Sequence, residues 1–292
     1  MEIIIAKNSG LCYGVKRALR LAYETRRKKK GNVYTLGDLI HNPRIIFELK
    51  ERGVFSIANP EDAQEGTLII RSHGVSPKLY SKLREKKINI VDATCPIVKK
   101  IQNLVHSLAQ TENEIVIVGN KNHPETQGLL GYSQGKGKVV ETGLQVRALP
   151  KKKKRAVMAQ STQDLELFQE VVAALVERTE ELEVFNTICR STQTRQRSTT
   201  SLAAEVDVLI IIGGKNSSNT NKLFNISRRV LHRTYFIAQA REIDHQMIEG
   251  AKKIGISGGA STPPEALEEA AAIIKSQFSN QSNREKTIQC QS

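Results

Sequence analysis

Short apolar runs alternate with longer amphipathic stretches along the chain, and this alternation predicts strands followed by helices. The apolar runs are rich in isoleucine, valine and leucine, and glycine or polar residues follow them. Strands that alternate with helices form parallel sheets with right-handed crossovers. The pattern therefore predicts an α/β fold whose ligands bind beyond the carboxyl ends of the strands.

The pattern occurs three times. Each repeat opens with a strand-like run, continues into a loop with one cysteine, and then becomes helix-like. The three openings are EIIIAKNSGLCYGVKRALRLAYE, INIVDATCPIVKKIQNLVHSLAQ and LEVFNTICRSTQTRQRSTTSLAAEV. Their cysteines are Cys12, Cys95 and Cys189.

Two further strand-like runs follow in each repeat. The first ends in a glycine 24 or 25 residues after the cysteine, at Gly37, Gly119 and Gly213. Four residues later comes a polar side chain, which is His41, His123 or Ser217. The second run ends at another polar turn, which holds His73 in the first repeat, Ser161 and Thr162 in the second, and Ser261 in the third.

We therefore expect nine βα units in three pseudo-repeated lobes with parallel sheets. The lobes are predicted at residues 1–87, 88–180 and 181–278, with a polar, frayed C-terminal tail at 279–292. A pseudo-threefold, trefoil-like packing of the lobes would bring equivalent strand ends to one central cavity. That cavity would hold a cluster bound by the three cysteines.

Composition excludes several classes of protein. A chain of 292 residues with 39% hydrophobic residues and a net charge of +14 is not disordered, collagen-like or a small disulfide scaffold. The first residues lack a basic segment, and the longest later apolar run, Val208 to Ile212, is too short to cross a bilayer. We expect a cytoplasmic protein with no export signal and no membrane anchor.

Two basic runs, at residues 26–30 and 151–155, would suit a polyanionic partner, although both could equally be solvated loops. Aromatic residues make up only 4% of the chain, and tryptophan is absent. Proteins that bind single-stranded nucleic acids interleave basic and aromatic side chains. Nucleic-acid binding is therefore not expected to be the main function.

The cysteines predict a metal site. Cys12, Cys95 and Cys189 each lie where a strand leads into a helix, and the helix dipole favours a thiolate there. Structural zinc sites usually show C-x-x-C spacing, whereas iron–sulfur clusters also take thiolates. A cubane with three cysteine ligands would leave one iron open as a Lewis acid. A zinc site completed by one histidine is the alternative. Cys290 has no equivalent in the other repeats, and we expect no role for it.

The polar turns predict an anion site. Backbone amides, hydroxyls and an amide side chain meet at a helix start in residues 215–219, which is typical of phosphate sites, although Ser217 could simply cap the helix. Together with His41 and His73 the turn indicates a phosphate or diphosphate pocket. Each histidine could instead be structural.

Glu125 is the candidate proton donor. Burial beside a cluster would raise the pKa of its carboxyl, and otherwise Glu125 is a first-turn acid that stabilises its helix. Thr162 could orient the proton or a water molecule. Ser161 and Thr162 could equally cap a helix.

The chain resembles a known family in nine motifs that occur in family order. They are GLCYGVKRA, IHNP, RSHGV, VDATCPIV, GNKNHPETQG, AQST, NTICRSTQTRQ, GGKNSSNTNKL and SGGAST. These motifs, over residues 1 to about 277, resemble 4-hydroxy-3-methylbut-2-enyl diphosphate reductase, the LytB/IspH family. The resemblance implies an iron–sulfur oxidoreductase that removes the hydroxyl of an allylic diphosphate to form isopentenyl and dimethylallyl diphosphates, the last step of the non-mevalonate isoprenoid pathway.

The resemblance also implies roles for individual residues. Cys12, Cys95 and Cys189 would hold one [4Fe-4S] cluster with an open iron, and Glu125 would deliver a proton with Thr162 as its helper. The substrate-binding residues would be His41, His73, His123, Thr162, Ser217, Ser218, Asn219 and Ser261. A serine precedes Thr162 where a second threonine is expected. The implied partner is a reduced ferredoxin or flavodoxin, which a basic surface such as residues 151–155 would attract. No oligomeric state is predicted.

Overall fold

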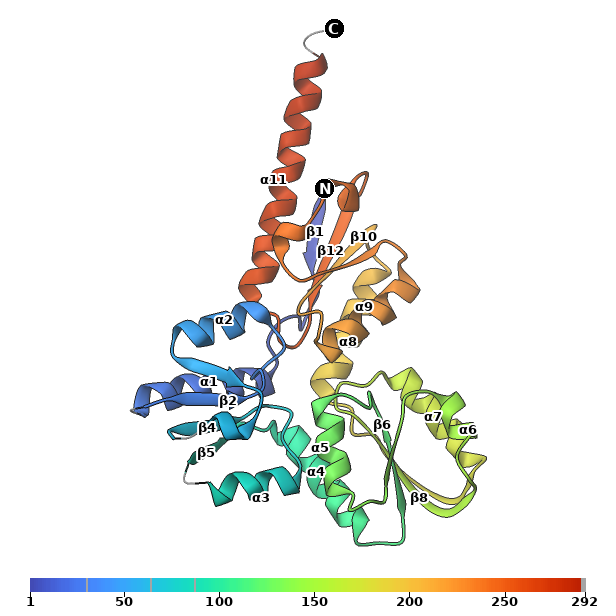
Figure 1. Cartoon of the computed structure of the whole chain (residues 1–292). Coiled ribbons are helices and arrows are strands. Elements are labelled where there is room, and N and C mark those ends of the chain that lie inside the picture. Colours follow the sequence, from blue (N-terminus) through green and yellow to red (C-terminus); the bar gives the residue numbers. More distant parts are fainter. Residues whose placement is uncertain (30, 64, 87, 290–292) are drawn as a thin grey trace. The chain divides into compact units, whose positions relative to one another are not determined.

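The computed structural model describes residues 1–29, 31–63, 65–86 and 88–289. They form three four-stranded sheets, and every strand pair is parallel (Figure 1). The predicted α/β class with three parallel sheets is confirmed. By its contacts the chain divides into one unit of Met1–Cys12 with Thr194–Ser292 and a second unit of Tyr13–Gln193.

The second unit contains two sheets. The first has the strand order β3-β2-β4-β5, and the second has the order β7-β6-β8-β9. The strands of the first are β2 (Val33–Leu36), β3 (Val54–Ile57), β4 (Thr67–Ile70) and β5 (Asn89–Asp92). Those of the second are β6 (Glu114–Val118), β7 (Gly137–Val140), β8 (Lys152–Ala159) and β9 (Thr179–Phe185).

Helices cover the sheets of this unit. They are α1 (Tyr13–Lys28), α2 (Pro43–Glu51), α3 (Pro77–Glu85), α4 (Pro96–Ala109), α5 (Pro124–Tyr132), α6 (Gly143–Arg147) and α7 (Leu165–Val176), with a 3-10 turn at Pro60–Asp62. One face of the second sheet packs against apolar side chains of α4 and α5, and the other packs against α6 and α7. The central strand β4 is buried along its whole length, with Thr67 as its one polar residue.

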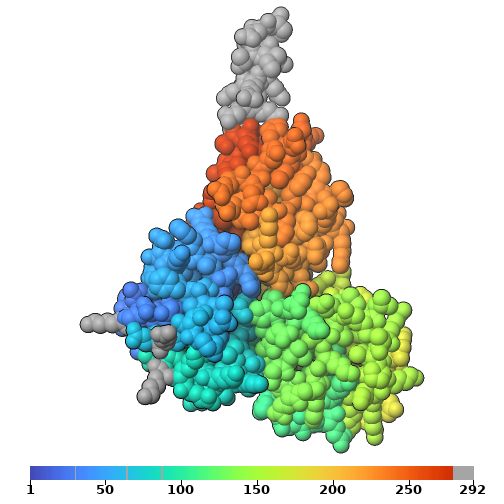
Figure 2. Space-filling view, viewed as in Figure 1, coloured from blue at the N-terminus to red at the C-terminus, as the bar shows by residue number. Residues whose placement is uncertain are grey.

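The other unit has one sheet of order β1-β12-β10-β11. Its strands are β1 (Glu2–Ile5), β10 (Val208–Ile212), β11 (Thr234–Ile237) and β12 (Lys253–Gly258). Its helices are α9 (Ser218–Val230), α10 (His245–Ile248) and α11 (Pro264–Gln289), with a 3-10 turn at Ala240–Glu242, while α8 (Arg190–Ala203) runs from one unit into the other. Figure 2 shows the surface of the molecule from the same side, coloured by residue number.

The sheets differ from the predicted lobes in two respects. The first strand of each predicted lobe pairs with a strand of another lobe. β5 of the second lobe pairs with β4 of the first, β9 of the third with β8 of the second, and β1 of the first with β12 of the third. The strands β3, β7 and β11, which the nine predicted βα units do not include, form an edge of each sheet. The pseudo-threefold packing of the lobes stays a prediction.

The C-terminal region also differs from the prediction of a frayed tail after Phe278. Helix α11 continues to Gln289, and Cys290 lies outside the described residues. None of the helices that the structure describes is long and apolar enough to span a bilayer.

Candidate active site

The three predicted cysteines share one backbone contact. The amide of Cys12 donates to the carbonyl of Ala260 at 3.1 Å, that of Cys95 to Ser72 at 3.0 Å, and that of Cys189 to Ser161 at 2.9 Å. The accepting residues immediately precede Ser261, His73 and Thr162, which are the polar residues predicted at the third turn of each repeat. Each cysteine loop is therefore bound to the equivalent polar turn.

Each cysteine also lies at the start of a helix. Cys12 directly precedes α1, Cys95 is the N-cap of α4, and Cys189 directly precedes α8. In the sequence Cys95-Pro96 the proline favours an extended residue before it and a helix after it, which fixes the thiol at the cap.

The chemistry of these three thiols fits an iron–sulfur cluster. None of the three forms a disulfide with another described residue, and all three are partly exposed. Helix N-termini favour thiolates, the form of cysteine that binds iron. Cys12 belongs to one unit, whereas Cys95 and Cys189 belong to the other.

His41, His73 and His123 come together within the second unit. The ring centroids are 4.8 Å apart for His41 and His73, 5.2 Å for His73 and His123, and 6.1 Å for His41 and His123. One ring nitrogen of each lies within 4.8 Å of the others. Three loops thus bring three imidazoles together at one place.

The electrostatics of this histidine cluster favour neutral rings. Burial and the positive charge of Arg71 lower the pKa of His41. Burial, the two neighbouring histidines and Arg71 lower the pKa of His73 well below its usual value. A nearby guanidinium opposes a bound cation and favours an anion. The surroundings of the cluster therefore fit an anionic ligand better than a metal ion.

His123 has a second task in the local structure. It is the N-cap of α5, and its Nδ1 accepts a hydrogen bond from the amide of Glu125 at 3.2 Å. A nitrogen that accepts from an amide carries no proton, so a ring N–H of His123 lies on Nε2.

Glu125 is buried and is held by a single residue. The amide of Ser161 donates to Oε1 at 2.6 Å, and the hydroxyl of Ser161 lies 2.7 Å from Oε2. Burial raises the pKa of the Glu125 carboxyl, and the two bonds from Ser161 partly oppose this rise. Because the amide occupies Oε1, a proton on the carboxyl resides on Oε2, next to the Ser161 hydroxyl.

Ser161, rather than the predicted helper Thr162, makes both of these bonds. The Thr162 hydroxyl accepts from Nε2 of Gln160 at 2.9 Å, and Oε1 of Gln160 accepts from the amide of Asn120 at 3.1 Å. The N-cap of α7 is Asp164, so Ser161 and Thr162 do not cap that helix. A serine in place of the expected threonine keeps the hydroxyl that reaches Glu125.

The remaining predicted residues lie in the other unit. Ser217 is the N-cap of α9 and accepts from the amide of Thr220 at 3.4 Å, so the capping interpretation is confirmed. Ser218 is the first residue of α9, and Ser261 is buried beyond β12. The side-chain amide of Asn219 is buried with no hydrogen-bond partner among the described residues. An unsatisfied buried amide at a helix N-terminus fits an anion that supplies the missing acceptor.

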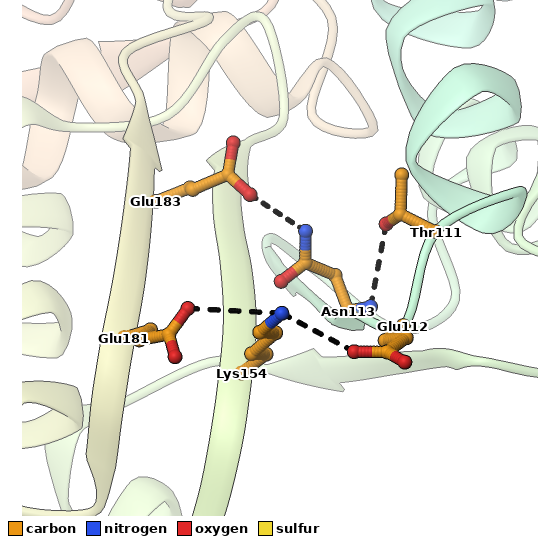
Figure 3. Close-up of a pocket in the computed structure, with 6 residues that line it drawn as sticks. All are labelled: Thr111, Glu112, Asn113, Lys154, Glu181 and Glu183. Carbon is orange, nitrogen blue, oxygen red and sulfur yellow. Dashed lines mark hydrogen bonds and ion pairs between the residues drawn. The ribbon is translucent and has the colours of Figure 1, made fainter.

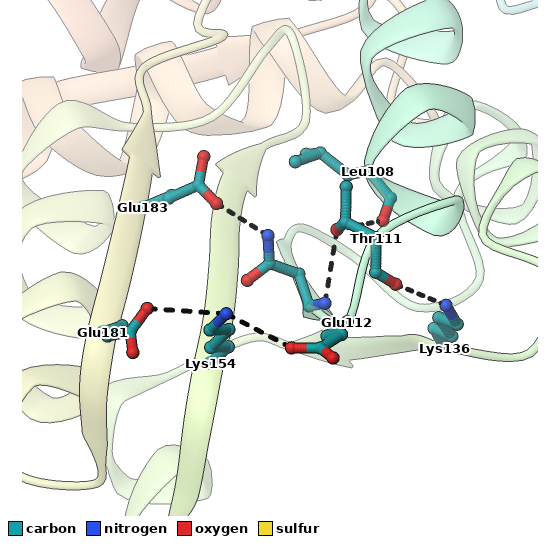
Figure 4. A network of polar contacts seen from close by, with 8 residues as sticks. Leu108, Thr111, Glu112, Lys136, Lys154, Glu181 and Glu183 are labelled. Atoms are coloured by element: carbon teal, nitrogen blue, oxygen red, sulfur yellow. Dashed lines mark hydrogen bonds and ion pairs between the residues drawn. The ribbon is translucent and has the colours of Figure 1, made fainter.

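Residues 152–155 of the basic run form the start of β8 rather than a loop, with Lys152 and Lys153 exposed. Lys154 lies opposite Glu181 of β9, with its Nζ 3.8 Å from Glu181 and 3.2 Å from Glu112 (Figure 3). These residues line a pocket of about 380 Å³. Around it, Asn113 donates to Glu183, and Nζ of Lys136 donates to the carbonyl of Thr111 (Figure 4).

Arg155 is the buried end of the same run. Its guanidinium contacts Glu114 at 2.6 Å and the carbonyls of Arg178 and Pro150 at 2.7 and 2.6 Å. The run lies at the opposite end of β8 from Ser161. Lys154 and Arg155 therefore have acidic partners within the fold and take no part in the site.

A comparison with family profiles identifies the chain. The profile described as LytB protein matches residues 3–275. The chain belongs to the LytB family. Curated LytB relatives named 4-hydroxy-3-methylbut-2-enyl diphosphate reductase include that of Aquifex aeolicus (strain VF5), which is 45% identical over 278 residues and aligns 94% of this chain with 96% of its own. That of Geotalea uraniireducens (strain Rf4) is 43% identical, with 94% of this chain and 97% of the relative aligned.

Two solved LytB structures resemble the fold. One, described as the structure of (E)-4-hydroxy-3-methyl-but-2-enyl diphosphate reductase, the terminal enzyme of the non-mevalonate pathway, is 45% identical with a TM-score of 0.70, covering 94% of this chain and all 100% of that chain. The other, the E-1-hydroxy-2-methyl-but-2-enyl-4-diphosphate reductase from Plasmodium falciparum, is 26% identical with a TM-score of 0.88, covering 93% of this chain and 87% of that chain.

Sequence reasoning missed the parts of this LytB site that depend on contacts. It left Ser161 as a possible cap and gave no role to Gln160 or Arg71. The positional signal was present, because Arg71 and Gln160 each lie two residues before a predicted polar residue, His73 and Thr162.

Proposed function

We propose that this chain is a reductase that converts (E)-4-hydroxy-3-methylbut-2-enyl diphosphate into isopentenyl and dimethylallyl diphosphates. Two electrons and two protons enter, the allylic C–O bond breaks, and water leaves. The observation that carries this proposal is Ser161, which binds the buried acid Glu125 through its amide and hydroxyl and the amide of Cys189 through its carbonyl. A proton donor and a metal-ligand loop are thereby attached to one residue.

Cys12, Cys95 and Cys189 are assigned to one [4Fe-4S] cluster. Thiols at three equivalent helix starts, none of them in a disulfide with another described residue, support this assignment. When bound, the cluster would supply the electrons and an open iron for the substrate hydroxyl. No described residue other than these three is assigned as a ligand.

The diphosphate is assigned to polar residues of both units. His41, His73 and His123 support it from the second unit, where their nitrogens are close together beside Arg71. In the other unit the supporting features are the start of α9 with Ser217 and Ser218, the unsatisfied amide of Asn219, and Ser261. Fixing the diphosphate orients the allylic carbons for reduction.

Glu125 is assigned as the proton donor, and Ser161 takes the helper role predicted for Thr162. With the carboxyl proton on Oε2, the Ser161 hydroxyl can receive it and pass its own proton to the departing oxygen. The raised pKa keeps the carboxyl protonated at a higher pH than an exposed glutamate. Thr162 keeps a supporting role through Gln160.

A small acidic one-electron carrier of the ferredoxin or flavodoxin type is the proposed electron donor. The net charge of +14 supports this, because opposite charge accelerates association. Since Lys154 is paired with acids, the attraction would come from other basic residues.

Iron and sulfide analysis with electron paramagnetic resonance on anaerobically purified protein tests the proposal. We expect a cubane signal that changes when the allylic diphosphate is added. Zinc, or no metal after anaerobic reconstitution, would contradict the proposed cofactor and favour the zinc alternative or a binding role.

A further inference from the structure

Arg71 lies beside the histidine cluster and has no assigned role. It directly follows β4 and comes two residues before His73. Its guanidinium packs over Gly37, where an added Cβ would come within 2.6 Å of Nη1. Gly37 also has a φ of +70°, a conformation that favours glycine. The glycine at the end of β2 thus leaves the space that the guanidinium fills.

Arg71 is the counterpart of Gln160 in the next repeat. The residue after each one, Ser72 or Ser161, accepts the amide of the cysteine that follows. Gly119 leaves space for Gln160 as Gly37 does for Arg71, since a Cβ on Gly119 would come within 2.9 Å of Oε1 of Gln160. In the second repeat the Gln160 amide is satisfied by Asn120 and Thr162.

The Arg71 guanidinium, in contrast, has no acceptor among the described residues. It makes no hydrogen bond or ion pair with any residue in the described part of the chain, and its Nε is fully buried. Asp38 is close enough to raise the pKa of Arg71, but burial outweighs it and the net shift is downward. Asp38 accepts from the Ser56 hydroxyl at 3.0 Å instead. A half-buried cation without an acceptor is costly unless an anion binds it.

The neighbouring histidines do not supply this charge. His41 and His73 are neutral near pH 7 because burial and Arg71 lower their pKa values. His123 cannot accept a second proton without losing its bond to the Glu125 amide. Arg71 is therefore the permanent positive charge next to the cluster.

We propose that Arg71 supplies the fixed positive charge with which the histidine cluster binds the diphosphate of the substrate. This inference rests on the proposed function and adds a residue to it. The imidazoles act as N–H donors and acceptors that fix the orientation, while the guanidinium provides the electrostatic attraction. Arginine suits this role because its planar fork matches phosphate oxygens.

Calorimetry of inorganic pyrophosphate binding to the cluster-loaded protein tests this proposal. Arg71→Gln should weaken binding about tenfold, the loss typical of one charge-assisted hydrogen bond, and Arg71→Lys should recover part of it. Arg20→Gln is the matched control, because it removes an equal charge from an exposed pair with Glu24 in the same unit, and it should change binding less than about twofold. In turnover, Arg71→Gln should raise KM about tenfold and leave kcat within about threefold.

A second variant separates the position of the charge from its presence. Gly37→Ala keeps Arg71 but places a methyl group where Nη1 lies, so it should also weaken pyrophosphate binding. Gly250→Ala has a φ of +69° and open space around it, so it should cost similar stability with no loss of affinity.

The outcomes distinguish this inference from the function on which it rests. If Arg71→Gln and Gly37→Ala bind pyrophosphate with unchanged affinity and the wild-type protein turns over the substrate, the proposed role of Arg71 is wrong. The proposed reductase function would then stand. A wild-type protein that carries the cluster but binds neither pyrophosphate nor the allylic diphosphate would overturn both proposals.

Discussion

At the scale of single residues, the proposed proton donor is a carboxyl group whose ionisation is opposed by burial. Glu125 is buried, and only Ser161 donates hydrogen bonds to its carboxylate among the described residues. Burial penalises the charged form, so the folded state favours the acid. The same feature that suits Glu125 to proton transfer makes it unfavourable for stability at neutral pH.

Replacing Glu125 should therefore separate activity from stability. Glu125→Gln keeps the shape and both contacts with Ser161 but holds no transferable proton, so turnover should fall by about 100-fold or more. The melting temperature at pH 7 should rise by about 2 °C, because the folded state no longer buries a carboxyl that loses its proton as the pH rises. Glu85→Gln, at the exposed end of α3, should change neither quantity. Near-normal turnover in Glu125→Gln would remove this residue from the mechanism.

Ser161 and Thr162 can be tested as a pair. Ser161→Ala deletes the hydroxyl next to Oε2 and should lower kcat by at least about tenfold, while Ser161→Thr should keep most activity because it keeps the hydroxyl. Thr162→Ala removes a contact with Gln160 and should have a smaller effect. Steady-state kinetics under anaerobic conditions would measure all three. A larger loss in Thr162→Ala than in Ser161→Ala would restore Thr162 as the helper.

At the scale of elements, helix starts carry most of the site. Asn42, Cys95, His123 and Ser217 are all N-caps, and in the first three a proline follows directly. Proline at the first helical position fixes the helix start and leaves the preceding side chain outside it. The x-Pro pairs therefore place Cys95 and His123 at the carboxyl edges of their sheets, with the helix dipole behind them.

Removing one cap cysteine should cost the metal and not the helix. Cys95→Ser replaces a thiolate by a favoured N-cap residue, so α4 should persist while the whole cluster is lost. Iron and sulfide should fall below about 10% of the wild-type content, with an unchanged circular dichroism spectrum of the helices. Cys290→Ser, which alters a thiol outside the described residues, should keep full iron. A complete iron complement in Cys95→Ser would contradict the shared cluster.

At the scale of the whole molecule, the three sheets share one strand order. In the first two sheets, with the orders β3-β2-β4-β5 and β7-β6-β8-β9, the chain enters at the strand next to one edge, adds that edge strand and then fills the other side. In the third sheet, with the order β11-β10-β12-β1, the position of β5 and β9 is taken by β1, the first strand of the chain. The apolar runs and the cysteine-to-glycine spacing were sufficient to predict parallel sheets and three equivalent turns. The strands β3, β7 and β11 were not predicted, because they are four-residue edge strands that are only partly buried and have no long apolar run.

The residues of the proposed site that could be predicted are those marked by local sequence signals. Helix starts and strand ends are marked by glycine, proline and polar residues, so the cysteines and histidines could be located. The bond between Glu125 and Ser161 joins residues 36 positions apart, and the choice of Ser161 over Thr162 depends on the direction of one side chain. The Lys151–Arg155 run could not be read as a strand, because its acidic partners Glu112, Glu114 and Glu181 are distant from it in the sequence.

The pH dependence of folding should reflect the neutral histidines. The pKa values of His41 and His73 are lowered in the folded state, so the unfolded chain takes up these protons at a higher pH than the folded protein does. Stability should therefore decline from pH 7 towards pH 5.5. The double variant His41→Gln with His73→Gln should decline less in denaturant titrations at both pH values. If the stability of the wild-type protein and of the double variant declined equally, His41 and His73 would not be held neutral in the folded state. Glu125 acts in the opposite direction, because its raised pKa favours the folded state at low pH, and it is common to both proteins.

The proposed reductase activity is tested most directly by product formation with the cluster-loaded protein. The protein would be incubated anaerobically with (E)-4-hydroxy-3-methylbut-2-enyl diphosphate and a chemical one-electron reductant, and the diphosphates identified by mass spectrometry and NMR. We expect both isopentenyl and dimethylallyl diphosphates to form, with two electrons consumed per molecule of substrate. We expect no product from Cys95→Ser. Unchanged substrate in the presence of an intact, reduced cluster would contradict the proposed reductase activity.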